Sequence, residues 1–353
     1  MDTEIIYVTP DRIKYILLHH KINHGNNDAI KAGNWDLRRV DLKNNDIYCL
    51  FMEYLTKGIP LTQANYPLDW ICNTEKEFTS KCKEIDELYQ DIKTKGYKTQ
   101  RELGNNDLSD EVKVQIDRKG AFLLEDGLCR VAVAKVLGIQ SIPVVITRRH
   151  YKWAKFRFEV NSYSREQLKG AYQQIIHPDF QKIRFQRRDD RWEIIANNLP
   201  FRGGNVLDLG SNWGYFCHKF EDLGFNCFAV ENNYRWIYFL KKFKEIEEKK
   251  FEIVPRSLFD FKRKKYDIVL ALSIFHHLLM TKELFDRLTG LLDTLEMKAM
   301  FFETHAPGEG KAGAYIDFGE DGFVDYVLQN SSCLSESKLL GRNERGRNMY
   351  LLT

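Results

Sequence analysis

The stretch Asn205-Val206-Leu207-Asp208-Leu209-Gly210-Ser211-Asn212-Trp213-Gly214-Tyr215-Phe216 decides the fold of the C-terminal half of the chain. An apolar run carries an acid and is followed by a turn with two glycines and then by an amphipathic segment, which predicts a strand, a tight turn and a helix. Glycines at such a turn let a ligand approach the backbone, and the first N–H groups of the helix have no partner within it. The stretch therefore predicts a ligand site at the end of a parallel strand.

A second apolar run, Asn226 to Val230, follows roughly twenty residues later and ends at Glu231. A carboxylate in that place can accept hydrogen bonds from both hydroxyls of a ribose. The glycines are spaced Gly210-x-x-x-Gly214, whereas a dinucleotide-binding turn has the spacing Gly-x-Gly-x-x-Gly. The two runs together predict a nucleoside site, and the spacing disfavours a dinucleotide.

These residues resemble the class I S-adenosylmethionine-dependent methyltransferases, and the resemblance covers the C-terminal half. VLDLGSNWG resembles the first motif of that family, AVE its ribose-binding acid, and YDIVLALSIFHHL its fourth strand and the loop beyond. The resemblance implies an α/β fold with a Rossmann-like sheet of seven strands, the last of them inserted antiparallel, and S-adenosyl-L-methionine as the cofactor. Asn212 departs from the family, because many members carry a glycine there.

The resemblance also implies which residues hold the cofactor. They stand after successive strands of the expected sheet, and they are Asp208, Gly210, Ser211, Asn212, Trp213, Gly214, Glu231, Asn232, Ser257, Leu258 and Ser273. Ser257 stands where the family usually has an acid that binds adenine. Leu258 and Phe259 are therefore candidates for stacking on the adenine, with Asp260 in reserve.

Catalytic candidates follow the fourth and fifth strands of the expected sheet: His276, His277, Glu303 and His305. A histidine can take the proton from a hydroxyl as the methyl group arrives, because the pKa of its ring lies near the working pH. The structural alternative for the histidine pair is that one ring packs and the other caps a helix. We expect an oxygen acceptor on a small molecule or glycan. The absence of an Asn-Pro-Pro-Tyr motif disfavours DNA methylation.

The N-terminal half contains a different pattern between residues 105 and 150. A predicted hairpin (112–116 and 121–124) precedes Asp126-Gly127-Leu128-Cys129-Arg130, a predicted helix (131–137) and a short strand (142–146). This order resembles the ParB and sulfiredoxin superfamily, which sets a Gly-x-x-Arg turn against nucleotide phosphates. The resemblance implies a smaller α+β domain that binds ATP or CTP, with magnesium, through Asp126, Gly127, Cys129 and Arg130. A packed Cys129 thiol and a salt-bridged Arg130 are the structural alternatives.

Other segments give weaker predictions. Residues 1 to about 100 are expected to be mostly helical, with helices through IKYILLHH after Pro10, over 46–57 and over 80–95. Bases and aromatics interleave from Thr147 to Arg157, which is typical of a solvated strand edge or of a surface that binds single-stranded nucleic acid. Helices are also expected over 161–176 and 189–198, and the chain divides into domains at 1–160 and 201–353 with a helical connector, 161–200.

Composition sets limits on the class of protein. A length of 353 residues exceeds what one hydrophobic core usually supports, so two domains are expected. The 53 basic and 50 acidic residues nearly cancel, which disfavours a dedicated nucleic-acid binder. Seven cysteines without Cys-x-x-Cys spacing predict free thiols and no structural metal site. No run is apolar enough to span a membrane, and we expect a cytoplasmic protein.

Three functions remain open on the sequence alone. The first is an S-adenosylmethionine-dependent methyltransferase that acts on a small-molecule or glycan hydroxyl and carries an N-terminal module that binds a nucleotide or phosphate, or acts as a small-molecule kinase. The second is an RNA-associated methyltransferase whose ParB-like module grips the nucleic acid. The third is a scaffold without catalysis.

Overall fold

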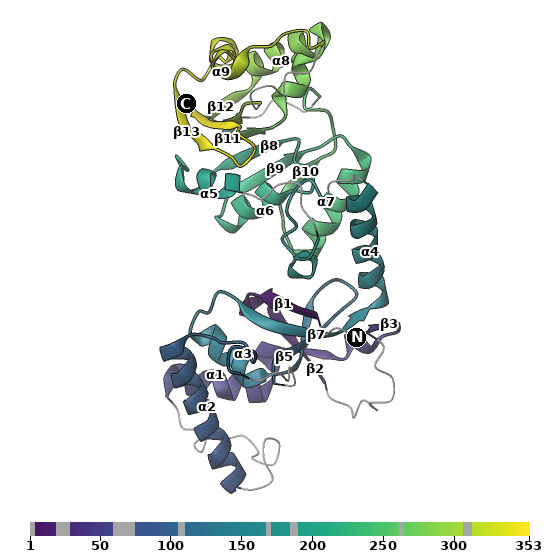
Figure 1. Ribbon diagram of the computed structural model, residues 1–353, viewed down its shortest axis with the longest axis vertical. Helices are drawn as coiled ribbons and strands as arrows, with labels where there is room; N and C mark the ends of the chain where they lie inside the picture. The colour runs from purple at the N-terminus through teal and green to yellow at the C-terminus, as the bar shows by residue number, and fades with distance from the viewer. Residues whose placement is uncertain are drawn as a thin grey trace. The chain divides into compact units, whose positions relative to one another are not determined.

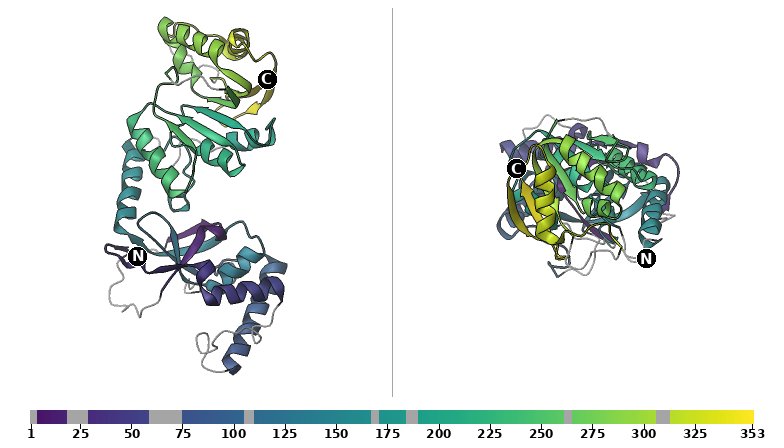
Figure 2. Two further views of the ribbon diagram at one scale, coloured as in Figure 1. Left: turned by 180° about the vertical axis from the view of Figure 1, so that it is seen from behind. Right: turned by 90° about the horizontal axis from the view of Figure 1, so that it is seen from above.

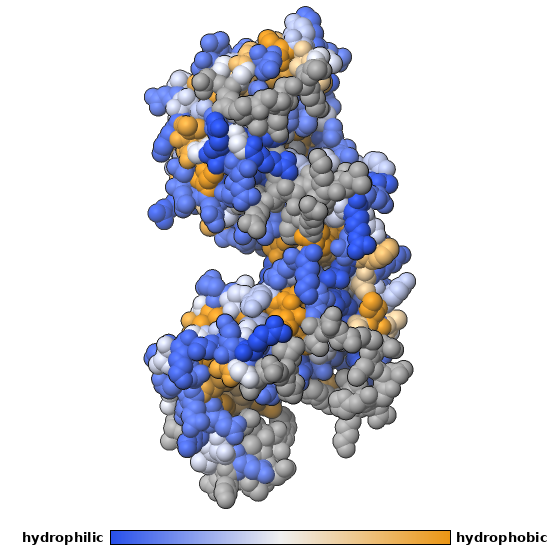
Figure 3. Space-filling view, viewed as in Figure 1, coloured by the Kyte–Doolittle hydropathy of each residue, from blue (hydrophilic) through white to orange (hydrophobic). Residues whose placement is uncertain are grey.

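A computed structural model describes residues 4–18, 29–58, 75–104, 110–166, 171–183, 190–260, 265–305 and 313–353. The chain forms two compact units, Met1–Val160 and Asn161–Thr353, and Figure 1 shows the elements of each. No helix within the described ranges is long and apolar enough to cross a membrane. Hydrophilic side chains dominate the coloured part of the face shown in Figure 3, with smaller apolar areas between them.

The C-terminal unit is built on a sheet of seven strands in the order β10-β9-β8-β11-β12-β14-β13. The strands are β8 (Asn205–Leu209), β9 (Asn226–Val230), β10 (Glu252–Val254), β11 (Lys265–Leu272), β12 (Glu296–Glu303), β13 (Ser337–Arg342) and β14 (Asn348–Leu352). The pairs from β10 to β12 are parallel, and β14 lies antiparallel between β12 and β13. All seven predicted strands are confirmed, as is the inserted antiparallel strand.

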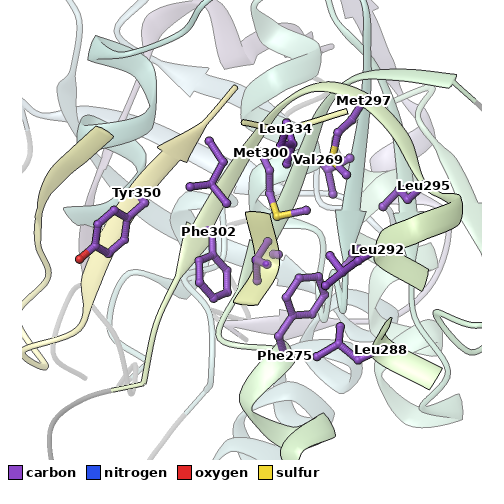
Figure 4. Packing of buried hydrophobic residues seen from close by; sticks show 14 of the residues in the cluster. Val269, Phe275, Leu288, Leu292, Leu295, Met297, Met300, Phe302, Leu334 and Tyr350 are labelled. Atoms are coloured by element: carbon purple, nitrogen blue, oxygen red, sulfur yellow. The ribbon is translucent and has the colours of Figure 1, made fainter. Parts of the chain in front are cut away.

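Helices cover both faces of this sheet (Figures 1 and 2). The helices are α5 (Asp190–Asn197), α6 (Tyr215–Asp222), α7 (Tyr234–Ile246), α8 (Lys282–Thr294) and α9 (Gly319–Asn330). Apolar side chains of α5, α6 and α7 share one core with the sheet, and those of α8 and α9 share the other. Figure 4 shows part of the second core, to which Phe275, Leu288 and Leu292 belong together with Val269 and Phe302 of the strands. Both faces are buried, as the continuous apolar runs of the strands require.

The N-terminal unit contains a mixed sheet of seven strands in the order β1-β7-β5-β6-β2-β4, with β3 paired to β7. The strands are β1 (Glu4–Val8), β2 (Ile13–Leu17), β3 (Ile30–Lys31), β4 (Arg39–Asp41), β5 (Val112–Ile116), β6 (Phe122–Asp126) and β7 (Ile142–His150). The helices are α1 (Asp46–Lys57), α2 (Glu75–Lys95) and α3 (Leu128–Val136); α1 and α2 each pack on α3, and α3 also packs on β5. The predicted hairpin, the helix after it and the next strand are confirmed as β5, β6, α3 and β7.

Two predictions for the N-terminal half were wrong. Residues 13–17 form strand β2 between β6 and β4 rather than a helix, and β1 adds a strand at the start of a region expected to be helical. The short apolar run of β2 fits either structure, and pairing with β6 decides between them. The stretch from Thr147 to Arg157 is not one strand edge, because β7 ends at His150 and α4 (Tyr151–Glu166) begins directly.

The helix predicted over 161–176 was also wrong. Helix α4 begins ten residues before that segment and ends at Glu166, and residues 167–170 of the predicted helix lie outside the described residues. Trp153, Phe156 and Val160 are buried on one side of α4. This spacing is helical, but the bases between them concealed it. Helix α5 confirms the helix predicted over 189–198, although residue 189 itself is not among those described.

A glycine contact in the N-terminal unit gives a stability test. A Cβ at Gly120 would lie 2.6 Å from the ring of Trp153, which is fully buried, and the backbone there has φ of +91°. We expect Gly120→Ala to lower the free energy of unfolding by about 2–4 kcal/mol through strain and displacement of the ring. Gly138→Ala is the control, because its φ is +63° and nothing lies within 4 Å of the added carbon. Equal losses in the two variants, measured by urea denaturation, would contradict the packing argument.

Candidate functional site

The turn after β8 is fixed by its own backbone and by the end of β9. The N–H groups of Gly210 and Ser211 both donate to the carbonyl of Val230 at 3.0 Å. Gly210, Asn212 and Gly214 have φ of +73°, +51° and +83°. Asparagine tolerates this left-handed conformation better than most side chains. Asn212 therefore keeps a left-handed turn at the position where the resembling family has glycine.

Glu231 joins this turn to the end of β9. Its side chain is 3% exposed. One carboxylate oxygen accepts the N–H of Asn212 at 2.9 Å, and the other accepts those of Asn232 and Asn233 at 2.8 and 2.9 Å. Burial raises the pKa of Glu231, and these backbone bonds oppose the rise. Because each oxygen can accept more than one hydrogen bond, the carboxylate can still receive ligand hydroxyls.

Several buried polar atoms of the turn have no hydrogen-bond partner in the described part of the chain. They are the hydroxyl of Ser211, both amide atoms of Asn212 and the indole nitrogen of Trp213. Buried polar groups are normally paired, so a cluster of unpaired ones needs an explanation. A polar ligand that offers both donors and acceptors, such as a nucleoside joined to an amino acid, fits this set.

Trp213, in the turn after β8, is held by aromatic rings and by the side-chain amide of Gln173. The Trp213 ring packs against Tyr163, Phe239 and Phe243 at centroid distances of 6.1, 5.2 and 5.7 Å. The side-chain oxygen of Gln173 accepts the N–H of Trp213 at 3.3 Å. Sequence reasoning missed Gln173, because it lies in a segment predicted to be a plain helix and no motif marks it.

Asp208 lies within β8 behind the turn. Burial raises the pKa of its carboxyl from 3.8 to about 7, although the bond from Cys217 and the charge of Arg191 lower it. The thiol of Cys217 lies 3.6 Å from a carboxyl oxygen of Asp208. The structure therefore places Asp208 within β8, beside the turn that follows the strand and in contact with Cys217 of α6.

Glu303 sits at the end of β12 in a fully buried network. Asn343 donates to one carboxylate oxygen at 2.6 Å, and Ser273 and Arg191 donate to the other at 2.7 and 3.3 Å. A nitrogen of Arg347 lies 3.8 Å from Glu303 and also donates to the Ser273 hydroxyl. Glu303 and Ser273 are thus brought together, and both bind protein groups. No motif marks Arg191, Arg347 or Asn343 in the sequence, because they come from distant segments.

The histidines divide into two places. His276 and His277 follow β11 in a short 3-10 helix, Phe275–Leu279, with their rings 4.0 Å apart, and His277 is exposed. His305 lies after β12, where one ring nitrogen is 3.4 Å from the Asp317 carboxylate and the ring packs near Phe323. The histidine pair therefore remains the more accessible of the predicted bases.

The segment after β10 meets the end of β9, because the N–H of Glu231 donates to the carbonyl of Val254. The hydroxyl of Ser257 accepts the N–H of Phe259 within this segment at 3.4 Å. Leu258 and Phe259 also line a cavity of about 260 Å³ against α8. The predicted adenine contacts are therefore near Glu231, but Leu258 and Phe259 also pack into the core.

In the N-terminal unit, the predicted phosphate turn opens helix α3. Gly127 has φ of +94°, and no side chain caps the helix at this end. The Asp126 carboxylate accepts the N–H of Gly127 at 2.8 Å and pairs with Lys113 at 3.3 Å. Cys129 and Arg130, both half-buried, stand in the first turn of α3. Within the described ranges, no group of three or more His, Cys, Asp or Glu side chains is placed to hold a metal ion.

The positive charge of the stretch from Thr147 to Arg157 is partly neutralised by an acidic side chain. Arg149 and Arg157 both pair with Glu4, at 2.5 and 3.2 Å. The guanidinium of Arg148 lies 5.8 Å from the centre of the Trp35 ring. These contacts lower the positive charge that the stretch would offer to a nucleic acid.

Comparison with known proteins gives partial matches, and no protein-family model matches the chain. The sequence is 34% identical over 97 residues to a tRNA U34 carboxymethyltransferase of Dichelobacter nodosus (strain VCS1703A), a match that covers 26% of this chain and 30% of that protein. Among solved structures, the bifunctional kinase-methyltransferase WbdD is 20% identical with a TM-score of 0.45, over 55% of this chain and 46% of that one. Magnesium protoporphyrin IX methyltransferase (ChlM) from Synechocystis PCC 6803, solved with bound S-adenosylmethionine, is 16% identical with a TM-score of 0.35, over 46% of this chain and 74% of that one.

The C-terminal unit has the class I methyltransferase fold. The strand order, the antiparallel strand β14 and the turn that faces a strand-end acid define this class. The match to the carboxymethyltransferase is consistent with an S-adenosylmethionine-dependent methyltransferase, and it spans under a third of that protein.

The raised pKa of Asp208 predicts how stability depends on pH. Between pH 3.8 and about 7 the folded carboxyl keeps its proton while the unfolded one loses it, so the free energy of unfolding falls as the pH rises through this range. Asp208→Asn removes this dependence, and we expect it to gain up to about 4 kcal/mol over the wild type between pH 4 and 8. Urea denaturation at several pH values measures the difference.

Asp267→Asn is the control for this measurement, because the pKa of Asp267 is lowered whereas that of Asp208 is raised. The bond from Lys298 and then the N–H of Asn205 lower the pKa of Asp267, so its ionised form stabilises the fold above its unfolded pKa. We expect Asp267→Asn to lose stability at neutral pH. Parallel pH profiles for the wild type and Asp208→Asn would contradict the assignment.

Proposed function

We propose that the C-terminal unit binds S-adenosylmethionine and transfers its methyl group to a hydroxyl of a small molecule or glycan. The observation that carries this proposal is the buried carboxylate of Glu231, locked by three backbone N–H groups against a left-handed turn whose side chains keep unpaired polar atoms. A carboxylate so fixed is positioned for the two ribose hydroxyls. The unpaired atoms of Ser211, Asn212 and Trp213 supply donors and acceptors to the rest of the cofactor.

The cofactor residues in this proposal are those of the turn and the neighbouring strand ends. Gly210 and Gly214 give the turn its left-handed backbone, and Gly214 also packs closely on α7, since a side chain there would meet Leu240 at 2.5 Å. Asn232 and Ser257 flank Glu231, and Leu258 provides an apolar surface for the adenine. Asp208 and Ser273 support the site from the protein interior, because the side chain of Asp208 contacts Cys217 and that of Ser273 bonds to Glu303. We add Gln173, which positions the Trp213 backbone.

When bound, the cofactor supplies a methyl group on a positively charged sulfur, which is already a strong electrophile. The protein's part is alignment of the acceptor, and removal of its proton where the acceptor is a hydroxyl. We assign proton removal to His276 or His277, which follow β11 at the carboxyl edge of the sheet. Glu303 and His305 take positioning roles in this scheme, because Glu303 is held by four side chains and His305 faces Asp317.

Glu231→Gln tests cofactor binding. The variant keeps the side-chain shape but replaces an accepting oxygen with an amide that donates, so we expect the affinity for S-adenosylmethionine to fall about 10–100-fold by calorimetry. Glu221→Gln is the matched control, because its carboxylate also accepts backbone N–H groups, those of Lys250 and Phe251, elsewhere in the unit. No binding by the folded wild type, or equal losses in both variants, would refute the proposal.

The histidine assignment is tested on the methylated product. Incubation with labelled donor and a cell extract identifies the acceptor, and His276→Asn and His277→Asn are then measured on it. We expect one of them to lower the transfer rate by about 10²–10⁴-fold with donor affinity unchanged, because loss of a general base affects the transfer step alone. Rates within about threefold of the wild type in both single variants and in the double variant would exclude a histidine base.

RNA is a second candidate acceptor, favoured by the tRNA-modifying relative. The pairing of Arg149 and Arg157 with Glu4 argues against a wide basic surface in the N-terminal unit. Labelled product that ribonuclease degrades, together with RNA binding that weakens steeply as salt rises, would favour RNA over a small molecule.

We further propose that the N-terminal unit is a ParB- or sulfiredoxin-like module that binds a phosphate group, with ATP or CTP as candidate ligands and phosphoryl transfer as the candidate activity. The uncapped first turn of α3, Gly127 and Arg130 support it, since helix N-termini and arginine both attract phosphate. In this proposal Cys129 contributes its backbone N–H, and Asp126 holds the turn.

Arg130→Ala tests the phosphate turn in the full-length protein. We expect ATP or CTP, with and without magnesium, to raise the unfolding temperature of the wild type, because a ligand that binds only the folded state stabilises it. The rise should vanish in Arg130→Ala and persist in Arg38→Ala, which changes an exposed arginine of the same unit. No rise with any nucleotide at millimolar concentration would remove the nucleotide proposal.

A further inference from the structure

Glu111 is a buried acid of the N-terminal unit, and the backbone next to it contacts the turn that opens α3. Glu111 is 1% exposed and directly precedes β5. A Cβ added to Gly127 would lie 3.1 Å from the Cα of Val112, the residue after Glu111. The backbone that carries Glu111 and the first turn of α3 are therefore in direct contact.

The two oxygens of Glu111 differ. Oε1 accepts the backbone N–H of Gln100 at 2.7 Å. Oε2 is buried and has no hydrogen-bond partner among residues 4–18, 29–58, 75–104 or the later described ranges. A buried carboxylate oxygen without a donor is costly. One oxygen of Glu111 thus fixes the side chain, and the other is available to a donor from a ligand.

Tyr97 adds a second unpaired group to the same place. Its hydroxyl is buried and lacks a partner in the described part of the unit. Burial raises the pKa of Tyr97 to about 12, the charge of Arg130 lowers it, and the charge of Glu111 raises it. Tyr97 stands three residues before Gln100, whose N–H donates to Glu111, so the chain that carries the hydroxyl runs beside the acid, and the charges of Glu111 and Arg130 both act on it.

We propose that Glu111 and Tyr97, with Gly127 and Arg130, form a binding site for a small phosphate ester that carries a hydroxyl close to its phosphate. The phosphate binds at the first turn of α3 and Arg130. The ligand hydroxyl donates to Oε2 of Glu111, and the Tyr97 hydroxyl donates to a ligand oxygen. This inference rests on the proposed phosphate turn and adds the feature that distinguishes one phosphate compound from another.

The charge of Glu111 explains why a bare anion is not the intended ligand. A carboxylate near the phosphate position repels any anion that brings no hydrogen-bond donor. A ligand hydroxyl turns the same carboxylate into an acceptor and satisfies its unpaired oxygen. The site therefore selects hydroxyl-bearing phosphate esters in two ways: Glu111 repels anions that lack a donor, and it accepts a hydrogen bond from those that have one.

Three probes test this in the full-length protein by calorimetry: inorganic phosphate, n-propyl phosphate and glycerol 3-phosphate. The two esters have carbon chains of equal length, and only glycerol 3-phosphate has hydroxyls. We expect it to bind about tenfold or more tightly than propyl phosphate, because a hydrogen bond to a charged group is worth at least that ratio. Equal affinities for the two esters would overturn the inference.

Variants separate this inference from the phosphate turn itself. Glu111→Gln keeps an oxygen for Gln100 and presents an amide that donates in place of Oε2. We expect it to abolish the advantage of glycerol 3-phosphate and to leave propyl phosphate binding equal or tighter. Arg130→Ala should weaken all three probes. An advantage that survives Glu111→Gln overturns the inference alone, whereas probe binding that is absent or indifferent to Arg130→Ala overturns the phosphate turn and the inference with it.

Tyr97→Phe gives an independent measurement. The variant removes only the unpaired hydroxyl, so we expect the ligand-free protein to unfold at the same or a higher temperature. Affinity for glycerol 3-phosphate should fall severalfold. A fall in stability without a fall in affinity would show that the Tyr97 hydroxyl is structural, and would remove it from the site.

Discussion

The three backbone hydrogen bonds to the Glu231 carboxylate are the constraint on which the C-terminal unit depends. They join the turn after β8 to the start of α7, at the edge where parallel strands present their carboxyl ends. Burial raises the pKa of Glu231, and the three bonds act against that rise. The left-handed conformation of Asn212 is retained because the carboxylate holds its N–H.

The same edge of the sheet concentrates buried polar groups that a plain core would exclude. Arg191, Asn343 and Arg347 reach Glu303 from segments far apart in sequence. Such a network is costly to bury, and breaking it on one side would strand a charge. Asp208 on β8, two strands from Glu303, has a raised pKa because its carboxyl is buried. The unit therefore places groups that are costly to bury at the edge of the sheet where the cofactor and acceptor are proposed to bind.

The N-terminal unit, which has a different fold, also buries polar atoms near a proposed ligand site. Its helices cover a mixed sheet, and the unpaired oxygens of Glu111 and Tyr97 lie beside the start of α3. Glu125, by contrast, is half-buried, and one of its carboxylate oxygens accepts hydrogen bonds from both Gln115 and Thr147. The acids at this sheet thus differ in the partners that protein groups give to their oxygens, and a buried oxygen without a partner marks a candidate binding group.

Local chemistry in the sequence determined the alternation of strands and helices in the C-terminal half, the tight glycine turn and the acid at Glu231, because strand periodicity, turn glycines and strand-end acids act over a few residues. The number of strands and the inserted antiparallel strand came from the family resemblance. Tertiary structure alone decided that residues 13–17 pair as a strand, since a short apolar run suits helix and strand alike. It also decided the partners of Glu303 and the roles of Gln173 and Glu111, because hydrogen bonds between distant segments leave no spacing in the sequence. Whether a carboxylate in a predicted motif finds hydrogen-bond partners depends on which distant segments of the chain pack around it.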